Sequence, residues 1–420
     1  MQNLNLEITG NPFIDSGIYA LKSKLNKDIK EISFHDLENE LEFIADLYAK
    51  PGWRKNMYSI FPNSILTNPT FVKMPNLKDI YLDTLNKLIC TIVLSNDGDG
   101  NCMGCGRRDS IELYGKDYIP LSGSGSLINF FPFASKGANY CPLCVLLIQF
   151  SPLLMYKCGQ KLILLHSNSS KVMDIWSRKV MNNISDQVSS KQYSGCYNHD
   201  IKIPLKGIFD IINQILDNDV GWKNENPSLN FYYFTNYNLR PQLDIFEVKP
   251  KVFNFLIKIP PDEVNNWKFI IRNTNNDELY EYLLSDKSLL KFFYDSEYGK
   301  VYCSWKLVKI YLKEIFSINN EIISAIEILG EKLSKCMLNE DSSKILQKIE
   351  KIVGINNFKE FINSYSGKFD KQLLIDYKED LLINEDKYWG VIYNSLLFRI
   401  YECYNNFRVH SIKTKKNRGK

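Results

Sequence analysis

The chain has 420 residues, of which 45% are hydrophobic, so it is long enough for two or three domains with a sizeable core. Its 52 Lys and Arg nearly balance its 48 Asp and Glu, and the net charge of +4 excludes a polycation that binds nucleic acid over its whole surface. No apolar run approaches the ~20 residues of a membrane span, and no signal peptide is visible at the N-terminus, which predicts a cytoplasmic protein with no membrane contact.

The first 60 residues are predicted to form helices joined by loops. Asp15 is expected to cap one helix, while Ser33 and Asp36 form a variant capping box before a second, which the sequence Pro51-Gly52 ends. A further helix is predicted over about 76–94, followed by a loop rich in Gly, Asn and Asp.

Two cysteine pairs are the most specific pattern in the chain. They read Cys102-Met-Gly-Cys105 and Cys141-Pro-Leu-Cys144, and either pair alone is also compatible with a redox dithiol or with chance spacing. Two residues between thiolates allow both sulfurs to reach one ion, so two such pairs predict a closed Cys₄ site that holds one structural Zn²⁺. We therefore expect a zinc module at about 96–150.

A glycine-rich segment lies between the pairs at residues 121–127 (LSGSGSL). Such a segment is typical of a flexible hairpin or linker loop. It also allows the backbone around Ser124 to approach a phosphate or a minor groove closely, because glycine has no side chain. It lacks the Gly-Lys-Ser/Thr ending of a phosphate-binding loop, which disfavours nucleoside triphosphate binding.

The middle third is predicted to mix short strands and helices. Strands are expected at 161–166 and 230–236 and in parts of 245–259, where prolines end the elements. The aromatic run Phe231-Tyr-Tyr-Phe234 offers stacking surfaces for bases, but such runs more often form sheet core.

The C-terminal third shows helical periodicity and contains no proline. Apolar residues recur at helical spacing from about 285 to 410, which predicts a bundle of about five helices, and residues 411–420 form a basic tail. The expected fold is α+β: a mixed N-terminal domain over 1–285 that contains the zinc module, then a helical bundle over 286–410.

A search for catalytic motifs favours binding over catalysis. The chain has four histidines, and none stands in a metal-binding or nucleophile motif. Carboxylates that come from distant segments leave no motif, so a zinc-stabilised nuclease or transferase acting on nucleic acid stays the alternative.

Two segments resemble the large subunit of type I-B CRISPR interference complexes (Cascade), in the branch that carries a pair of C-x-x-C knuckles. The first is residues 9–21 (TGNPFIDSGIYAL), and the second is residues 131–144 (FPFASKGANYCPLC) together with 102–106 (CMGCG). The resemblance covers about a third of the chain. It implies a non-catalytic subunit that reads a short protospacer-adjacent motif in duplex DNA, stabilises the opened strand and helps to recruit the helicase–nuclease.

The resemblance also implies partners and site residues. The partners are the backbone and end-capping subunits of the complex, CRISPR RNA and target double-stranded DNA, and the helical bundle resembles the separate small subunit of related complexes. Cys102, Cys105, Cys141 and Cys144 match the zinc pattern. The residues that we predict to contact nucleic acid are Asn11, Arg107, Arg108, Ser124, Lys136 and Asn139. For Asn11 a turn is the competing use, since Asn-Pro is a common turn signal.

Overall fold

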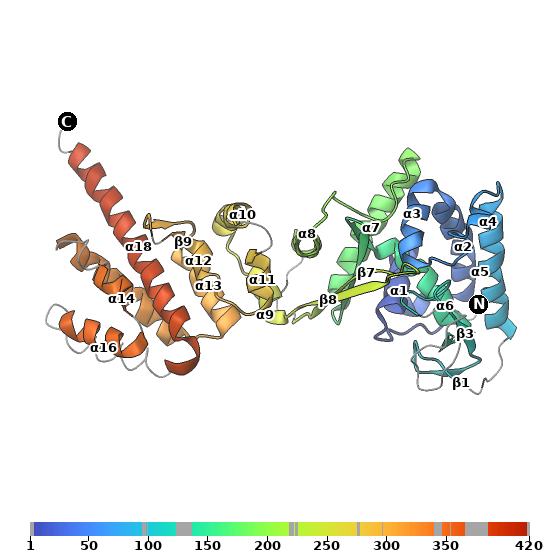
Figure 1. The fold of residues 1–420 in the computed structure, drawn as a ribbon, viewed down its shortest axis with the longest axis horizontal. Helices are drawn as coiled ribbons and strands as arrows, with labels where there is room; N and C mark the ends of the chain where they lie inside the picture. The colour runs from blue at the N-terminus through green and yellow to red at the C-terminus, as the bar shows by residue number, and fades with distance from the viewer. Residues whose placement is uncertain are drawn as a thin grey trace. The chain divides into compact units, whose positions relative to one another are not determined.

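The computed structural model describes residues 4–94, 98, 100–122, 137–217, 222, 226–274, 278–295, 297–339, 347–352, 354–365 and 385–417. They form two compact units, Met1–Val248 and Lys249–Lys420 (Figure 1). The predicted α+β class is confirmed, with small sheets in a largely helical chain and a helical C-terminal region.

The division between the units lies earlier than the predicted boundary at 285/286. Helix α9 (Pro250–Ile257) packs on α13 (Trp305–Phe316) of the second unit. The Phe255 ring lies 5.5 Å from that of Tyr311 and 5.4 Å from that of Trp267. These apolar contacts join the segment after Val248 to the helical unit, which the sequence pattern alone did not indicate.

Unit 1 begins with helices. They are α1 (Pro12–Leu25), η1 (Ile29–Glu31), α2 (Phe34–Ala49), α3 (Pro51–Ile60), α4 (Pro69–Val72) and α5 (Leu77–Leu94). The predicted capping box of α2 is confirmed, because Ser33 Oγ accepts from Asp36 N at 3.2 Å and Asp36 Oδ2 accepts from Ser33 N at 3.0 Å. Asp15, in contrast, does not cap α1; Asn11 does so.

An antiparallel four-stranded sheet lies beside these helices in unit 1 (Figure 1). Its order is β5 (Tyr156–Cys158), β6 (Lys161–Ser167), β7 (Leu229–Thr235) and β8 (Gln242–Val248). The strands predicted at 161–166 and 230–236 are confirmed. Strand was also predicted in parts of 245–259, and of that range only 245–248 lies in a strand, β8, because Pro250 occupies the first turn of α9.

Helix α1 forms the centre of unit 1. It contacts α6 (Pro142–Phe150), η2 (Ser151–Leu154), α7 (Ser170–Ser190) and β6, and residues 13–21 are all buried. Gly17 permits a close approach of α1 to α6, since a Cβ there would lie 1.9 Å from the carbonyl oxygen of Leu147 on α6. Among the described residues of the unit, the one helix not yet named is α8 (Pro204–Leu216).

Unit 2 is mainly helical. Besides α9 and α13, its described elements are η3 (Pro261–Glu263), α10 (Val264–Asn273), α11 (Glu278–Leu284), α12 (Leu290–Phe293), β9 (Tyr294–Asp295), β10 (Lys300–Val301), α14 (Asn320–Asn339), α16 (Gly354–Tyr365) and α18 (Glu385–Asn417). Helix α14 packs along α18. Helix α18 continues to Asn417, through most of the predicted basic tail, because no Gly or Pro follows Gly390 within it.

Within the described residues, no helix is both long enough and apolar enough to span a membrane.

Candidate metal centre

The first cysteine pair lies in the turn of a short hairpin. Strand β1 (Gly100–Asn101) pairs with β2 (Arg108–Asp109), and residues 102–107 form the turn between them. Cys102 N donates to the Arg107 carbonyl at 3.0 Å, and Gly106 N donates to the Cys102 carbonyl at 2.8 Å. Gly106 has a φ of +72°, which glycine adopts without strain. The chain therefore turns tightly enough to present both sulfurs on one side.

The second pair lies at the start of α6. Strand β4 (Ala138–Tyr140), which pairs with β3 (Glu112–Tyr114), leads directly into this helix. Cys141 is the N-cap, and Cys144 lies in the first turn. Met103 N donates to the Asn139 carbonyl at 2.8 Å, so the hairpin turn is hydrogen-bonded to the strand that precedes the second pair.

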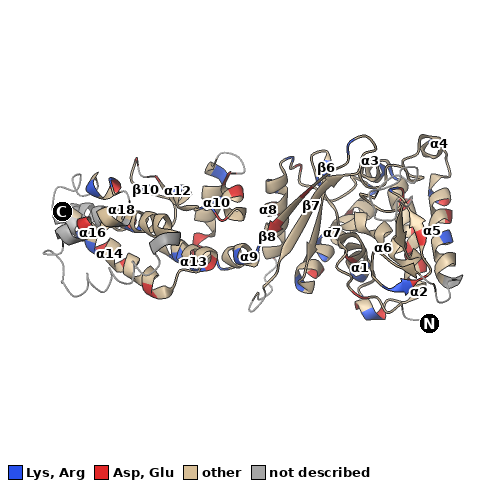
Figure 2. Ribbon diagram, turned by 60° about the horizontal axis from the view of Figure 1, so that its bottom comes forward, with Lys and Arg blue, Asp and Glu red and all other residues tan. Residues whose placement is uncertain are grey.

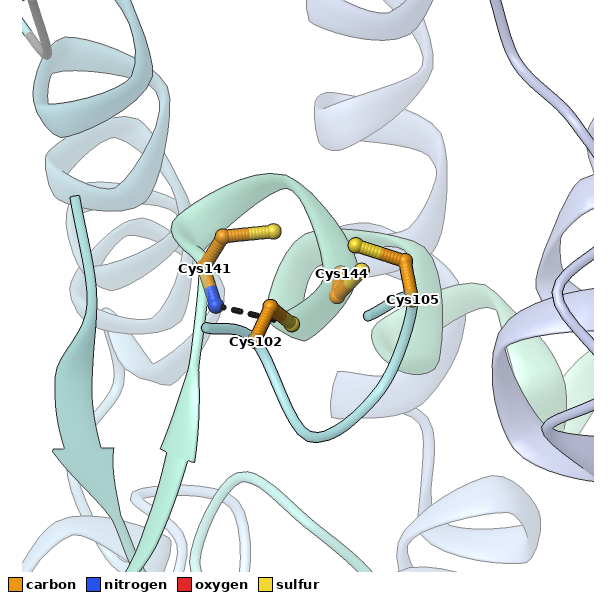
Figure 3. A group of neighbouring side chains, drawn as sticks. All are labelled: Cys102, Cys105, Cys141 and Cys144. Atoms are coloured by element: carbon orange, nitrogen blue, oxygen red, sulfur yellow. Dashed lines mark hydrogen bonds between the residues drawn. The ribbon is translucent and has the colours of Figure 1, made fainter. Parts of the chain in front are cut away.

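The two pairs converge on one point (Figure 3). All four sulfurs lie within 4.8 Å of one another. Sulfurs at ~2.3 Å from a tetrahedral ion would lie about 3.8 Å apart, so only small shifts are needed to bind one. Cys102, Cys141 and Cys144 are buried and Cys105 is half-buried. The convergence of both pairs favours a shared metal ion over two independent dithiols.

Nitrogen donors surround the sulfurs. Cys102 Sγ accepts from Gly104 N at 3.3 Å and from Cys141 N at 3.2 Å, and Cys105 Sγ accepts from Arg107 Nε at 3.4 Å. Such N–H groups stabilise thiolate charge and orient the ligands. The start of α6 adds the positive end of a helix dipole next to Cys141 and Cys144.

Neighbouring thiols of the cluster alter one another's protonation. Hydrogen bonds with the Cys141 and Cys144 thiols lower the pKa of Cys102. The reverse contacts with Cys102 raise the pKa values of Cys141 and Cys144. A divalent ion removes the repulsion between neighbouring thiolates and allows them to be deprotonated together. The donor set thus fits a metal ion in a closed, four-coordinate site, which leaves no position for a reacting water.

The N-terminal segment at residues 9–21 packs against this centre. Asn11 caps α1, accepting from Phe13 N at 3.1 Å and Ile14 N at 3.3 Å, and its Nδ2 donates to the Tyr140 hydroxyl at 3.4 Å. A Cβ at Gly104 would lie 2.5 Å from Ile14 Cδ1. The two segments that carry the resemblance are therefore neighbours in space, although residues 22–101 separate them in the sequence.

A buried Asp15–His166 pair was missed by the sequence analysis. Asp15 is fully buried and accepts from Thr9 N (2.7 Å), Thr9 Oγ1 (2.8 Å), Gly10 N (2.9 Å) and His166 Nε2 (2.9 Å). It thereby holds the loop before α1 against strand β6. No short-range signal identifies the pair, because 151 residues separate its members.

The other predicted contact residues have different surroundings. Arg107 is bonded to Cys105, Arg108 is exposed on β2 opposite Asn101, and Asn139 lies half-buried on β4 opposite Leu113. Ser124 and Lys136 lie outside the described residues. The structure thus brings Asn11, Arg107 and Asn139 near the cysteines, while a contact of any of them with DNA stays a prediction.

The aromatic run on β7 is core, as the sequence favoured. Phe231 and Phe234 are fully buried, Tyr233 is nearly so and Tyr232 is half-buried.

A hollow of about 570 Å³ lies at one end of the four-stranded sheet. Tyr233 lines it together with Lys157, Lys161 and Lys202.

A second polar cluster joins residues that no motif connected. His199 Nδ1 lies 3.1 Å from Asp210 Oδ2, and His199 Nε2 lies 3.0 Å from the Tyr197 hydroxyl. Gln214 Nε2 donates to Asp210 at 2.8 Å. The cluster combines a half-exposed histidine with a carboxylate, so His199 and Asp210 are the candidate residues for acid–base chemistry.

Comparison with known proteins was made for the whole chain. No curated protein matches it. Residues 95–156 match the family model described as CRISPR-associated protein (Cas_CXXC_CXXC). The match spans β1, β2, β3, β4 and the whole of α6, and thus both C-x-x-C pairs and the elements that hold them. The segment that builds the cysteine centre is thus the segment that supports a CRISPR-associated protein with a CXXC pair.

Proposed function

We propose that this chain is the non-catalytic large subunit of a type I-B CRISPR RNA-guided DNA surveillance complex. The match of residues 95–156 to the CRISPR-associated CXXC family carries the proposal, because its four cysteines converge on one point as a single metal site requires. The subunit would recognise the protospacer-adjacent motif in duplex DNA, stabilise the opened strand and help to recruit the helicase–nuclease.

In this proposal the metal is one structural Zn²⁺. Zinc is the usual ion of closed Cys₄ sites, and the arrangement leaves no open coordination position. The ion would fix the hairpin turn of residues 102–107 to the start of α6, which is itself buried against α1 and α5. Its role is therefore to support the surface of unit 1 that carries Arg107 and Arg108.

The charge distribution supports a subunit that shares its nucleic acid with partners. Lys and Arg are interspersed with Asp and Glu on the helices of both units (Figure 2). In the described part of unit 2, most lysines that contact another charged or aromatic side chain are paired with carboxylates, as Lys306 is with Asp262 at 2.6 Å. Local groups, and not a continuous basic face, would then contact DNA, while base pairing with a guide RNA reads the sequence.

The proposal is tested by isolating the tagged chain from its native cytoplasm. Mass spectrometry and RNA sequencing of the eluate are expected to find Cascade backbone subunits together with repeat-derived CRISPR RNA. A tagged Cys158→Ser/Cys196→Ser variant, which loses two buried thiols outside the centre, should recover the same partners. Recovery of the chain without guide RNA would contradict the proposal.

DNA recognition is tested on the assembled complex. A duplex library with randomised bases beside the target should yield a short enriched motif, whereas the isolated chain should bind duplex DNA weakly and without preference. Tight, selective duplex binding by the isolated chain would contradict this division of roles.

The non-catalytic role has its own test. The chain is incubated with DNA and RNA in the presence of Mg²⁺ or Mn²⁺, and no cleavage is expected. Cleavage that is lost in His199→Ala or Asp210→Asn would support the alternative, a zinc-stabilised nucleic-acid-processing enzyme.

A further inference from the structure

Unit 2 contains a hollow that is lined by aromatic rings. It has a volume of about 530 Å³, and it lies between the C-terminal half of α10, the end of α12 and the β9–β10 hairpin. This volume is within the range of ~300–1,000 Å³ that is typical of small-ligand pockets. Phe269, Phe292 and Tyr302 supply the aromatic walls.

One of these rings is exposed without a role in the core. Phe269 has 44% of its surface exposed, whereas its neighbours Trp267 and Ile270 on α10 are buried. Its ring lies 5.7 Å from that of Tyr302 at an interplanar angle of 39°. The exposed Phe269 ring and the half-buried Tyr302 ring beside it give a flat ligand a surface on which to stack.

Cations lie beside the rings. Lys300 Nζ is 5.4 Å from the centre of the Tyr302 ring, and Lys291 Nζ is 4.7 Å from the centre of the Phe292 ring. Lys291 also pairs with Glu278 at 2.5 Å, while no carboxylate within the described ranges forms an ion pair with Lys300. One ammonium group thus remains available for a ligand anion close to the stacking surface.

Asp295, the acidic residue that lines the hollow, accepts hydrogen bonds from the backbone of its own hairpin. Asp295 Oδ1 accepts from Glu297 N at 2.9 Å and from Tyr298 N at 3.2 Å. The Asn273 amide nitrogen donates to the Phe269 carbonyl at 2.8 Å, which places its side chain at the rim next to Phe269. Asp295 is also the register partner of Lys300 across the hairpin and interacts with the Tyr302 hydroxyl. A ligand with a flat ring and one negative charge is therefore favoured only where its anion lies closer to Lys300 than to Asp295.

We propose that this hollow binds an unpaired nucleobase, stacked on Phe269 and Tyr302, with the adjacent phosphate at Lys300. Aromatic platforms beside a cation are the recurring way in which proteins hold single strands without reading sequence. Bases within a duplex are stacked on one another and cannot enter, so the site selects single-stranded nucleic acid. Only the identity of the strand, the displaced DNA strand, rests on the proposed function.

Crosslinking locates the site on the full-length chain. Single-stranded 15-mers that contain 5-iododeoxyuridine or 5-iodouridine are irradiated with the protein, and mass spectrometry identifies the joined residue. The crosslink is expected at Phe269 or Tyr302. A crosslink confined to Tyr233, at the lysine-lined hollow of unit 1, would overturn the proposal.

Binding measurements test the stacking itself. Phe269→Leu keeps an apolar side chain but removes the flat ring, and it should weaken single-strand binding about 5- to 100-fold. Phe269→Trp should bind within about twofold of the parent chain. Tyr298→Leu is the matched control, because Tyr298 is 78% exposed on the same hairpin but does not line the hollow.

Three further comparisons complete the test. DNA and RNA single strands, and a duplex of the same sequence, are compared by fluorescence anisotropy, and the duplex should bind at least about tenfold more weakly than the better single strand. Lys300→Ala should lower the slope of log affinity against log salt concentration by about 1, as expected for the loss of one phosphate contact. Equal affinities of the parent chain, Phe269→Leu and Phe269→Trp would refute the stacking site.

The stacking site and the proposed function can each be wrong without the other being wrong. If the tagged chain assembles with guide RNA but Phe269→Leu binds single strands normally, the stacking site is wrong and the proposed function stands. If no guide RNA is recovered but Phe269→Leu loses single-strand binding while Phe269→Trp keeps it, the stacking site stands and another strand is its ligand.

Discussion

The cysteine centre of unit 1 and the aromatic hollow of unit 2 are built in opposite ways. At the centre the polar atoms point inward: three of four cysteines are buried, and backbone N–H groups bond to their sulfurs. At the hollow the apolar atoms point outward, since Phe269 is 44% exposed next to a lysine. A buried, closed set of ligands stabilises a fold, whereas an exposed set of rings is available for recognition.

This contrast predicts where substitutions act. Changes at the cysteine centre and at the helices that support it should alter stability first, and function only as a consequence. Changes at the hollow should alter binding and leave the free energy of unfolding nearly unchanged.

The largest effect is expected from loss of the metal. Cys102→Ser/Cys141→Ser should lower bound zinc from one ion per chain to nearly none and lower the melting temperature of unit 1 by at least about 10 °C, because metal binding is coupled to folding. Elemental analysis and calorimetry measure both quantities. The matched variant Cys158→Ser/Cys196→Ser should retain zinc, and full zinc in the first variant would exclude the Cys₄ site.

The next effect concerns the packing of α1 on α6. Gly17→Ala should destabilise unit 1 by about 2–4 kcal/mol, because the added Cβ would lie 1.9 Å from the Leu147 carbonyl oxygen and the helices would have to separate. Urea unfolding measures the change. Gly390→Ala, on α18 of unit 2 with no atom within 4 Å of the new Cβ, should be neutral or slightly stabilising. Equal effects of the two would contradict the close packing.

A comparable effect is expected from the buried carboxylate. Asp15→Ala should destabilise unit 1 by about 3 kcal/mol, since it leaves Thr9 N, Gly10 N and His166 without their acceptor. The matched control is Asp46→Ala, which removes an exposed pair with Lys50 and should cost less than about 1 kcal/mol. A small effect of Asp15→Ala would show that water replaces the lost acceptor.

Asn11 allows its two suggested uses to be separated. Asn11→Ala should cost about 1 kcal/mol through loss of the α1 N-cap, whereas Asn11→Ser preserves capping and should be nearly neutral. Both are then compared for duplex DNA binding in the assembled complex. Loss of binding by the stable Asn11→Ser variant would indicate that the amide contacts a base edge, and normal binding would indicate a cap alone.

The smallest effect depends on pH. A hydrogen bond from Lys27, with further bonds from Ser33, lowers the pKa of Asp36 from 3.8 to about 2. The ionised form therefore stabilises the folded state above about pH 3.8, and this contribution is lost as the pH falls through 2. Asp36→Asn should cost at most about 1 kcal/mol at pH 6, because the pair with Lys27 is exposed, and the difference should shrink between pH 4 and 2. A difference independent of pH would mean that capping geometry, and not charge, is responsible.

The sequence alone determined the features that depend on local spacing. The C-x-x-C pairs predicted a shared ion because two intervening residues limit where two sulfurs can point. Ser33 and Asp36 predicted a helix start because capping acts within one turn. The strand at 161–166 and the helical texture of the C-terminal third followed from apolar periodicity.

Only the tertiary structure decided which distant residues meet. Asp15 faces His166, and Gly17 touches Leu147, through packing that leaves no trace in the spacing of either segment. The division at Val248 depends on Phe255 packing against Tyr311. The hollow around Phe269 likewise joins helix α10 to the β9–β10 hairpin, which lies beyond two further helices in the sequence, and whether a ring is core or surface depends on what packs above it.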